Sequence, residues 1–326
     1  MIRILATDGM EKGAIAALEQ KGCEVVCEFY EPEALKEAVQ SCDVLVVRSA
    51  TKVRAPHIDA AAAAGRLKLI IRGGVGVDNI DVAYAEQKGI AVRNTPRASS
   101  DAVAELALGH MFSVARYISA AGHTMRTGGW EKKAYKGIEL TGRTVGIVGY
   151  GRIGQALGRR CQALGMKVLA YDVYQNRDLE CDTMRYVELD ELLRTADLIS
   201  LHCPLFPDTQ GIINRESIAK MKDGVILINA ARGALVDTKD LIEAVESGKI
   251  GSVGTDCCEG EDEFIRTDRK YDDLVVNHDY IILKSFQNTI VTPHVAFFTD
   301  QAVSDMVESS VKSVVQFAAG EDTPLE

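Results

Sequence analysis

The stretch TVGIVGYGRIGQALGRRCQALGMKVLAYD, residues 144–172, decides the fold. It begins with an apolar run, Val145–Val148, that predicts a buried strand. Three glycines in G-x-G-x-x-G spacing follow, and a helical pattern then continues to Gly165. A second apolar run ends at Asp172, 18 residues after the third glycine. Strand, glycines, helix, strand and acid therefore occur in the order of a dinucleotide-binding βαβ unit.

The three glycines have separate physical roles in such a unit. Gly149 permits a tight turn, Gly151 lets the backbone approach a pyrophosphate, and Gly154 lets the helix pack close to the strand. The free N–H groups at the start of the helix then face the phosphates. A carboxylate at Asp172 accepts hydrogen bonds from the adenosine ribose and repels a 2′-phosphate, which predicts NAD rather than NADP. A glycine-rich turn without a ligand is the alternative interpretation of this spacing.

The composition is that of an ordinary soluble chain, with 326 residues of which 47% are hydrophobic and 26% charged. This length predicts about two domains. The net charge of −10 argues against nonspecific nucleic-acid binding, and no apolar run is long enough for a membrane span or a signal peptide. Eight scattered cysteines without a C-x-x-C pair favour a reducing compartment and no structural zinc. We therefore expect a cytoplasmic protein that binds neither nucleic acid nor membrane and holds no metal.

Strand and helix patterns alternate along both halves of the chain, which predicts parallel sheets with helices on both faces. The first series of strands is expected at Ile2–Ala6, Val25–Phe29, Val44–Arg48, Leu67–Ile71 and Ile90–Val92, and the second begins at Thr144. One long helical pattern, Ser100–Arg126, separates the two series, and a last helix, near Asp300–Ala318, is expected to return to the first domain. The fold class is α/β, with two doubly wound parallel-sheet domains and a cleft between them. Residues 256–279 hold nine acidic and three basic side chains, and we expect a solvated surface insertion there; a regulatory patch is the alternative.

Three polar residues lie past the carboxyl ends of expected strands of the second series. They are Arg232, Glu261 and His294. Open α/β sheets bind ligands at the carboxyl ends of their strands. An arginine there can clamp a carboxylate, a histidine can exchange a proton with an alcohol or carbonyl, and a carboxylate can hold the histidine ring. The alternatives are a capping or surface arginine, one more member of an acidic run, and a core histidine.

The remaining histidines are weaker candidates. His57 and His278 are expected to be exposed, and His110 and His123 fall within a helical pattern. His202 ends an expected strand at the cofactor edge, where its backbone can line the site without taking part in chemistry.

The chain resembles the D-isomer-specific 2-hydroxyacid dehydrogenase family along nearly its whole length. The matching segments are VGYGRIG, LHCPL, NAARGALVD and TPH ending at His294. The resemblance implies that Arg232 binds the substrate carboxylate, His294 is the acid and base, and Glu261 is its partner. It also implies a flavodoxin-like substrate domain, residues 1–98 with 291–326, and a Rossmann NAD domain, residues 99–290. The implied NAD-binding residues are Gly149, Tyr150, Gly151, Arg152, Ile153, Gly154, Asp172, His202, Cys203, Pro204, Ala230, Ala231, Arg232, Asp256 and His294.

The two ends of the chain resemble different groups of this family. VVRSATKV, IIRGGVGVDNID and GGWEKKAYKGIEL are similar to D-3-phosphoglycerate dehydrogenases, whereas CCEGEDEF and PHVAFFTDQAV resemble D-lactate dehydrogenases. The first likeness implies that substrate is bound by Arg48, Arg72, Gly73, Gly74, Val75, Gly76, Lys132 and Arg232. Arg48 can also be a surface charge at a strand end.

These likenesses leave the substrate open between classes. The narrower prediction is a D-3-phosphoglycerate dehydrogenase, and the alternative is an enzyme for D-lactate or for aryl or branched D-2-hydroxy acids. An NAD-sensing binding protein of the same fold is the alternative from another class. The family also commonly dimerises through the region of Ser100–Arg126, so we expect a homodimer.

Overall fold

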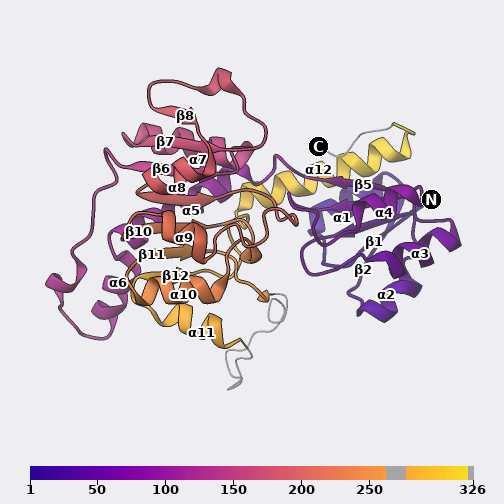
Figure 1. Cartoon of the computed structure of the whole chain (residues 1–326). Coiled ribbons are helices and arrows are strands. Elements are labelled where there is room, and N and C mark those ends of the chain that lie inside the picture. Colours follow the sequence, from indigo (N-terminus) through magenta and orange to yellow (C-terminus); the bar gives the residue numbers. More distant parts are fainter. Residues whose placement is uncertain (262–276, 322–326) are drawn as a thin grey trace. The chain divides into compact units, whose positions relative to one another are not determined.

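Two compact units make up the structure, a computed structural model that describes residues 1–261 and 277–321 (Figure 1). The first unit comprises Met1–Ser99 with Phe298–Glu326, and the second comprises Ser100–Phe297. The boundary expected at residue 291 lies after Phe297 instead, because Thr289–Val291 is a strand of the second unit's sheet. Residues 262–276, which hold most of the acidic side chains counted in 256–279, lie outside the described residues.

The first unit is built on a five-stranded parallel sheet. Its elements are β1 Ile2–Ala6, α1 Lys12–Gln20, β2 Cys23–Cys27, α2 Pro32–Ala38, β3 Val44–Val47, α3 Ala55–Ala64, β4 Leu69–Arg72, α4 Val82–Gln87, β5 Ala91–Asn94 and α12 Asp300–Ala318. The strand order is β2-β1-β3-β4-β5. All four residues of β3 are buried, as expected for a parallel strand covered on both faces. α12 packs against α1 and β4 and contributes Val314 to the core, so the last helix does return to the first unit.

The second unit is built on a seven-stranded parallel sheet. Its elements are α5 Ser100–Ala115, α6 Ile118–Arg126, η1 Lys132–Tyr135, β6 Thr144–Val148, α7 Arg152–Ala163, β7 Lys167–Tyr171, η2 Arg177–Leu179, β8 Met184–Tyr186, α8 Leu189–Thr195, β9 Leu198–Leu201, α9 Arg215–Lys220, β10 Val225–Asn229, η3 Gly233–Leu235, α10 Thr238–Glu246, β11 Ile250–Thr255, α11 His278–Ser285 and β12 Thr289–Val291. The strand order is β12-β11-β10-β9-β6-β7-β8. The order therefore reverses between β6 and β9, and such a reversal marks the ligand-binding edge of an open sheet.

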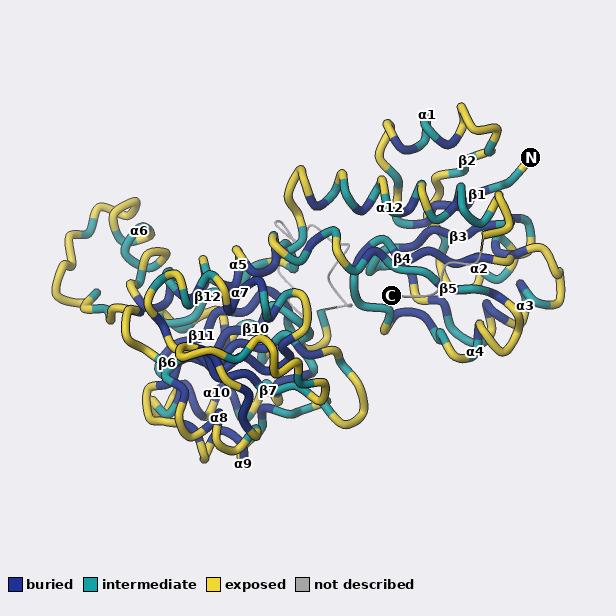
Figure 2. Tube along the Cα trace, turned by 90° about the horizontal axis from the view of Figure 1, so that it is seen from above, coloured by how far each residue is buried: buried dark blue, intermediate teal, exposed yellow. Residues whose placement is uncertain are grey.

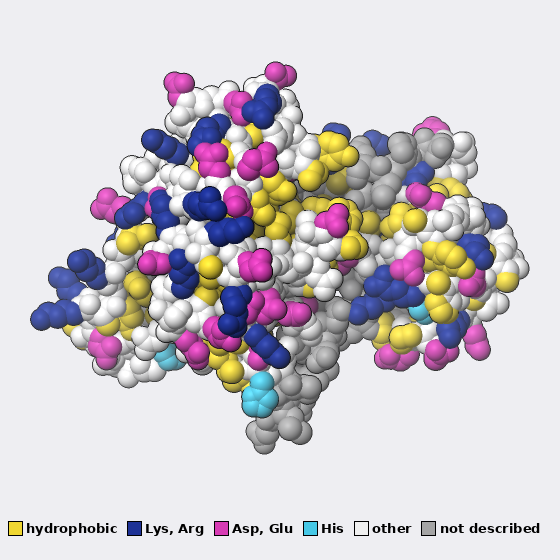
Figure 3. All heavy atoms as spheres, viewed as in Figure 1, with side chains coloured by type: hydrophobic (Ala, Val, Ile, Leu, Met, Phe, Trp, Pro, Cys, Tyr) yellow, Lys and Arg dark blue, Asp and Glu magenta, His cyan; other side chains and the backbone are white. Residues whose placement is uncertain are grey.

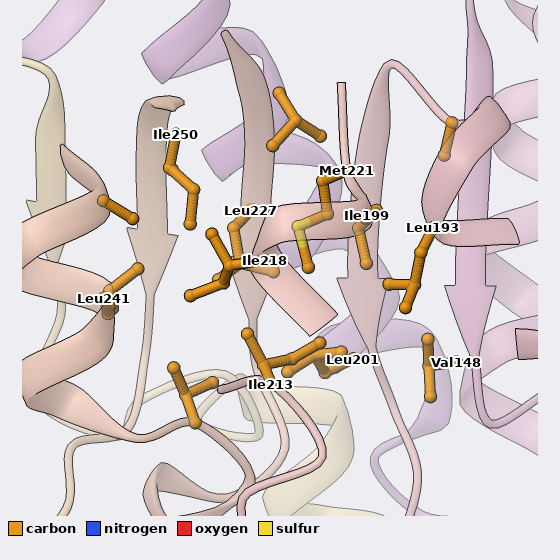
Figure 4. Packing of buried hydrophobic residues seen from close by; sticks show 14 of the residues in the cluster. Val148, Leu193, Ile199, Leu201, Ile213, Ile218, Met221, Leu227, Leu241 and Ile250 are labelled. Carbon is orange, nitrogen blue, oxygen red and sulfur yellow. The ribbon is translucent and has the colours of Figure 1, made fainter. Parts of the chain in front are cut away.

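Apolar side chains from the strands and the covering helices fill one face of this sheet (Figure 4). The strands contribute Val148, Ile199, Leu201, Leu227 and Ile250, and the helices and the segments beside them contribute Leu193, Ile213, Ile218, Met221 and Leu241. All of these residues are less than one tenth exposed. This packing fixes the strands whose ends carry the candidate site.

The single helix predicted over Ser100–Arg126 is wrong, because the structure has two helices there. Tyr117, between α5 and α6, has a φ of 53°, a left-handed conformation that an α-helix does not contain. α5 buries residues on one side, whereas α6 has no buried residue. Figure 2 shows α6 as a mainly exposed segment that stands off from the sheet of its unit.

The two parallel sheets confirm the predicted α/β fold class. The sequence pattern missed the short edge strand β8 and the helix α11. In the part of the chain that the structure describes, no helix is long and apolar enough to cross a membrane.

Candidate active site

The glycine loop after β6 has the close contacts that its spacing predicted. Gly149 has a φ of +91°, and a Cβ there would lie 2.3 Å from the backbone nitrogen of Cys203. A Cβ on Gly154 would lie 2.3 Å from the carbonyl oxygen of Gly149. Glycine is therefore required at both positions, since neither backbone can move without shifting a central strand.

The space in front of α7 is open, and this fits a bound pyrophosphate. A Cβ built on Gly151 would meet no atom within 4 Å, and α7 starts at the next residue, Arg152. Asp172 lies beside this loop, where its carboxylate accepts hydrogen bonds from the Tyr150 N–H at 2.6 Å and the Tyr174 N–H at 3.0 Å. The residues present thus suit the phosphates and ribose of a dinucleotide.

The segment after β9 lies against the glycine loop. The His202 N–H donates to the Val148 carbonyl oxygen at 2.7 Å, and the His202 Nε2 is 2.8 Å from the Ser200 Oγ. Burial lowers the pKa of His202 to about 4 and raises the pKa of the Cys203 thiol to about 11. Both side chains are therefore uncharged near neutral pH, which suits a lining role for His202.

A turn after β10 carries Arg232. The side chain of Asn229 holds this turn, since its Nδ2 donates to the Arg232 carbonyl oxygen and its Oδ1 accepts from the Ala231 N–H. A Cβ on Gly233 would lie 2.1 Å from the carbonyl carbon of Cys258. The Arg232 turn and the loop that leads to Glu261 are therefore in backbone contact, which brings the two candidates into one site.

Glu261 and His294, the two residues that the family resemblance paired, lie in hydrogen-bond contact. Nδ1 of His294 lies 2.6 Å from Oε1 of Glu261, and the Cys258 N–H donates to Oε2 at 2.9 Å. Both side chains are about one fifth exposed, at 21% for His294 and 18% for Glu261. His294 has a φ of 53°, which is uncommon for a residue other than glycine and marks a backbone held by its surroundings.

The Asp256 carboxylate provides that support. It is 2% exposed, and it accepts hydrogen bonds from the N–H groups of Val295 at 3.0 Å and Ala296 at 2.7 Å. A third bond comes from the Thr292 hydroxyl at 2.5 Å. Asp256 was predicted as an NAD-binding residue; the structure shows it binding the two backbone N–H groups that follow His294 and the Thr292 hydroxyl that precedes it.

The first unit places the other predicted substrate residues at the carboxyl edge of its own sheet. Arg48 follows β3, and its N–H donates to the Asp8 carboxylate at 2.6 Å. Arg72 ends β4 and is 9% exposed; its Nη2 donates to the Ser49 Oγ at 3.0 Å and its Nη1 to the Gly73 carbonyl oxygen at 3.3 Å. Gly74 has a φ of +146°, and a Cβ on it would overlap the Arg72 guanidinium. Arg72 therefore holds the loop 73–76 against β3.

Lys132 lies elsewhere, in the exposed turn η1 that follows α6. Among the described residues no hydrogen bond or ion pair links it to the contact between Glu261 and His294. Figure 3 shows lysine and arginine side chains gathered at one end of the second unit. Lys132, Lys133 and Lys136 are exposed and close in sequence. No group of three or more His, Cys, Asp or Glu side chains within the described ranges is arranged to hold a metal ion.

Sequence reasoning missed three residues that shape the site: Asn229, Thr292 and Cys258. A polar residue that ends an apolar strand, as Asn229 does in VILIN, was an available signal. Cys258 contributes its backbone N–H, which the residue type does not reveal. His57 was expected to be exposed but is 5% exposed, because its ring accepts from the Arg54 N–H and faces the Pro32 carbonyl oxygen.

Comparisons with known proteins agree with this geometry. Residues 108–296 match the NAD binding domain of the D-isomer specific 2-hydroxyacid dehydrogenases. A hydroxypyruvate reductase of Thermotoga maritima is 46% identical over 302 residues, which cover 92% of this chain and 93% of that protein. A D-3-phosphoglycerate dehydrogenase of Methanocaldococcus jannaschii is 41% identical over 97% of this chain, but the match covers 58% of that longer protein.

Solved structures show the same fold over the whole chain. A D-lactate dehydrogenase from Aquifex aeolicus, complexed with NAD and lactic acid, has a TM-score of 0.87 and 30% identity, and the match covers 98% of this chain and 96% of that one. The likeness spans both units. The chain therefore belongs to the D-isomer specific 2-hydroxyacid dehydrogenase family and is an NAD-dependent oxidoreductase of D-2-hydroxy acids.

Proposed function

We propose that this dehydrogenase reduces hydroxypyruvate, or a closely related short 2-oxo acid, to the D-2-hydroxy acid. The observation that carries the proposal is the 2.6 Å contact between His294 Nδ1 and Glu261 Oε1, on a loop in backbone contact with the Arg232 turn. Reduction of a 2-oxo acid needs a proton donor and a cation for the carboxylate. This part of the second unit offers both.

The proposed roles follow from the chemistry of each group. The Arg232 guanidinium binds the substrate carboxylate, and Nε2 of His294 donates a proton to the carbonyl oxygen. Glu261 stabilises the imidazolium until that transfer. NAD, when bound, supplies the hydride chemistry. The N–H groups at the start of α7 hold its pyrophosphate, and Asp172 holds its adenosine ribose.

We assign the substrate domain to the first unit and the NAD domain to the second. Backbone amides of residues 73–76 are proposed to bind the substrate, and Arg48 is proposed to face its third carbon. Arg72 supports this loop from behind, through its bonds to Ser49 and Gly73. Lys132 remains a predicted substrate contact.

Hydroxypyruvate is placed ahead of its phosphorylated form for two reasons. The Thermotoga maritima hydroxypyruvate reductase matches this chain over 93% of its own length, whereas 58% of the Methanocaldococcus jannaschii D-3-phosphoglycerate dehydrogenase is matched. Arg72, one of two arginines predicted to bind a phosphate, is buried and donates to two groups of its own unit. The narrower sequence prediction, 3-phosphoglycerate, therefore becomes the second candidate, and it is favoured by Arg48 and by the 41% identity to that relative.

A panel of 2-oxo acids assayed with NADH tests the proposal. Hydroxypyruvate should give the highest kcat/KM, ahead of 3-phosphohydroxypyruvate, pyruvate and phenylpyruvate. The control is His294→Ala, which should lose about 10²–10⁴-fold in kcat with nearly unchanged NADH affinity. A preference for the phosphorylated acid would support the second candidate, and one for phenylpyruvate would support an aryl-acid enzyme. NADH binding without turnover of any acid would support an NAD-sensing protein and overturn the proposal.

We also propose that the chain forms a homodimer through the α5–α6 region and that it works in the cytoplasm. α6 has no buried residue, and Ile118 and Met125 are 57% and 54% exposed. Exposed apolar side chains on one helix are typical of a surface that a partner covers. All eight cysteines are free thiols, which is typical of a reducing compartment.

A further inference from the structure

His110 is a buried histidine whose position the proposed reaction does not yet explain. It lies in α5, which packs against β10 and β11, and its side chain is 4% exposed. A Cβ on Gly254 of β11 would lie 2.8 Å from the Cβ of His110 and 3.2 Å from its Cγ. The absence of a side chain at Gly254 therefore leaves room for the His110 imidazole beside β11.

The His110 ring contacts the Thr292 hydroxyl, which already donates a hydrogen bond to Asp256. Its Nε2 lies 3.2 Å from the Thr292 Oγ1, and that oxygen lies 2.5 Å from Oδ1 of Asp256. A carboxylate only accepts hydrogen bonds, so the Thr292 hydroxyl uses its one O–H to donate to Asp256. The other acceptor near this hydroxyl, the Thr255 carbonyl oxygen, is farther away at 3.5 Å. Oγ1 must therefore accept from His110, which requires the proton of the neutral ring to be on Nε2.

The second ring nitrogen is consistent with that tautomer. Nδ1 of His110 is buried and has no hydrogen-bond partner in the ranges that the structure describes. A buried nitrogen acceptor without a hydrogen-bond partner costs less free energy than a buried N–H donor without one. Burial also lowers the pKa of His110 below its ordinary value, against the opposing effect of Asp256. The ring is thus neutral and donates in one direction.

The chain of bonds ends at His294. Asp256 accepts hydrogen bonds from the Thr292 hydroxyl and from the N–H groups of Val295 and Ala296. These two residues follow His294, whose φ of 53° needs external support. A displacement of Asp256 would move this backbone and with it the bond between His294 and Glu261.

We propose that His110 is a positioning residue for the dehydrogenase reaction. Its Nε2–H fixes the Thr292 hydroxyl, the hydroxyl fixes Asp256, and Asp256 keeps the backbone of His294 in the conformation that aligns the ring with Glu261. This inference rests on the proposed function, in which His294 donates the proton. His110 acts through Thr292 and Asp256, without touching the substrate.

Steady-state kinetics of five variants test this role in the full-length enzyme. His110→Leu removes the donor, and we expect about a threefold to tenfold loss of kcat with unchanged NADH affinity. His110→Gln keeps an N–H donor at a similar reach and should retain most of the activity. In a Thr292→Val background, His110→Leu should cause no further loss, because the two residues act in series. His278→Leu, at an exposed position of α11, is the matched control and should leave kcat unchanged.

The position of the proton on the neutral His110 ring can be measured without any turnover of substrate. Long-range ¹H–¹⁵N spectra of the wild-type protein, with the His110 signals assigned by their loss in His110→Gln, should show the proton on Nε2. A proton on Nδ1 would overturn the proposal, as would equal losses from His110→Leu in both backgrounds. If His110→Leu fails to fold, the kcat of His110→Gln and the tautomer of the wild-type ring still test the proposal. Wild-type enzyme that reduces no 2-oxo acid overturns the proposed function itself, whatever the tautomer.

Discussion

Glu261 is the residue at which the proposed proton transfer can be tested most directly. Its Oε1 lies 2.6 Å from Nδ1 of His294, and its Oε2 accepts the Cys258 N–H at 2.9 Å. Glu261→Gln keeps the shape of the side chain, but an amide has one oxygen and cannot accept hydrogen bonds from both groups. We therefore expect a lower kcat for reduction with nearly unchanged NADH affinity, measured by steady-state kinetics. Equal kcat values for wild type and variant would remove Glu261 from the mechanism.

Gly233 is the second residue at which the structure makes a sharp prediction. A Cβ there would lie 2.1 Å from the Cys258 carbonyl carbon and 2.4 Å from the Glu259 nitrogen, so Gly233→Ala must push the Glu261 loop away from the Arg232 turn. We expect a lower melting temperature, and a kcat that falls further than the loss of folded protein explains. Gly109→Ala is the control, because a Cβ on Gly109 of α5 meets nothing within 4 Å. Alanine in a helix interior is stabilising by about 0.5–1 kcal/mol, so both variants having the same effect would refute the contact argument.

Arg232 and His294 were singled out because each follows a strand whose apolar run is easy to recognise, and parallel strands put their carboxyl ends at one edge. Glu261 lies within an acidic run, and its selection depended on the family resemblance. Position along the chain was not sufficient for Thr292 or His110, which are 182 residues apart. Their contact depends on how α5 packs on β11, and a helical pattern in the sequence does not predict which strand a helix packs on.

Elements were predicted well where burial dictates residue type. β1 and α12 have the bounds that the pattern indicated, since each combines buried apolar residues with clear ends. β8 has three residues and lies at the sheet edge, so it lacks the length from which a period can be recognised. The break at Tyr117 was missed because apolar residues continue on both sides of it, and a φ of 53° at tyrosine has no sequence signal.

The exposure of α6 makes the proposed dimer testable at the level of one element. Replacing Ile118 and Met125 together by lysine puts charge on two side chains that are 57% and 54% exposed, so it should leave the unit folded but shift sedimentation from dimer to monomer. The single tryptophan, Trp130, is 82% exposed, and its emission should move to longer wavelength if the partner covers it in the wild type. Leu179→Lys, at a 37% exposed site of η2, is the control. A wild-type protein that is monomeric at micromolar concentration would contradict the dimer.

At the scale of the whole molecule, the proposed function assigns substrate binding to residues of both units. Arg232 of the second unit is proposed to bind the carboxylate that every 2-oxo acid has, whereas Arg48, which follows β3 in the first unit, is proposed to bind the group on the third carbon. Arg232→Ala should therefore lower kcat/KM for every acid, since all carry the carboxylate. Arg48→Ala should lower kcat/KM by roughly 10–150-fold for 3-phosphohydroxypyruvate if that arginine binds the phosphate, because a hydrogen bond to a charged group contributes about 1.5–3 kcal/mol.

The proposed preference for hydroxypyruvate makes a different forecast for the same variant. A hydroxyl on the third carbon offers Arg48 a neutral partner, so the loss should be about fivefold, and pyruvate, which lacks that hydroxyl, should lose nothing. Arg72→Ala should behave differently again, because its guanidinium bonds Ser49 and Gly73. Its removal should lower the melting temperature and reduce kcat/KM for all acids to a similar extent. A loss in Arg72→Ala confined to the phosphorylated acid would show that the guanidinium reaches the phosphate after all and would return 3-phosphoglycerate to first place.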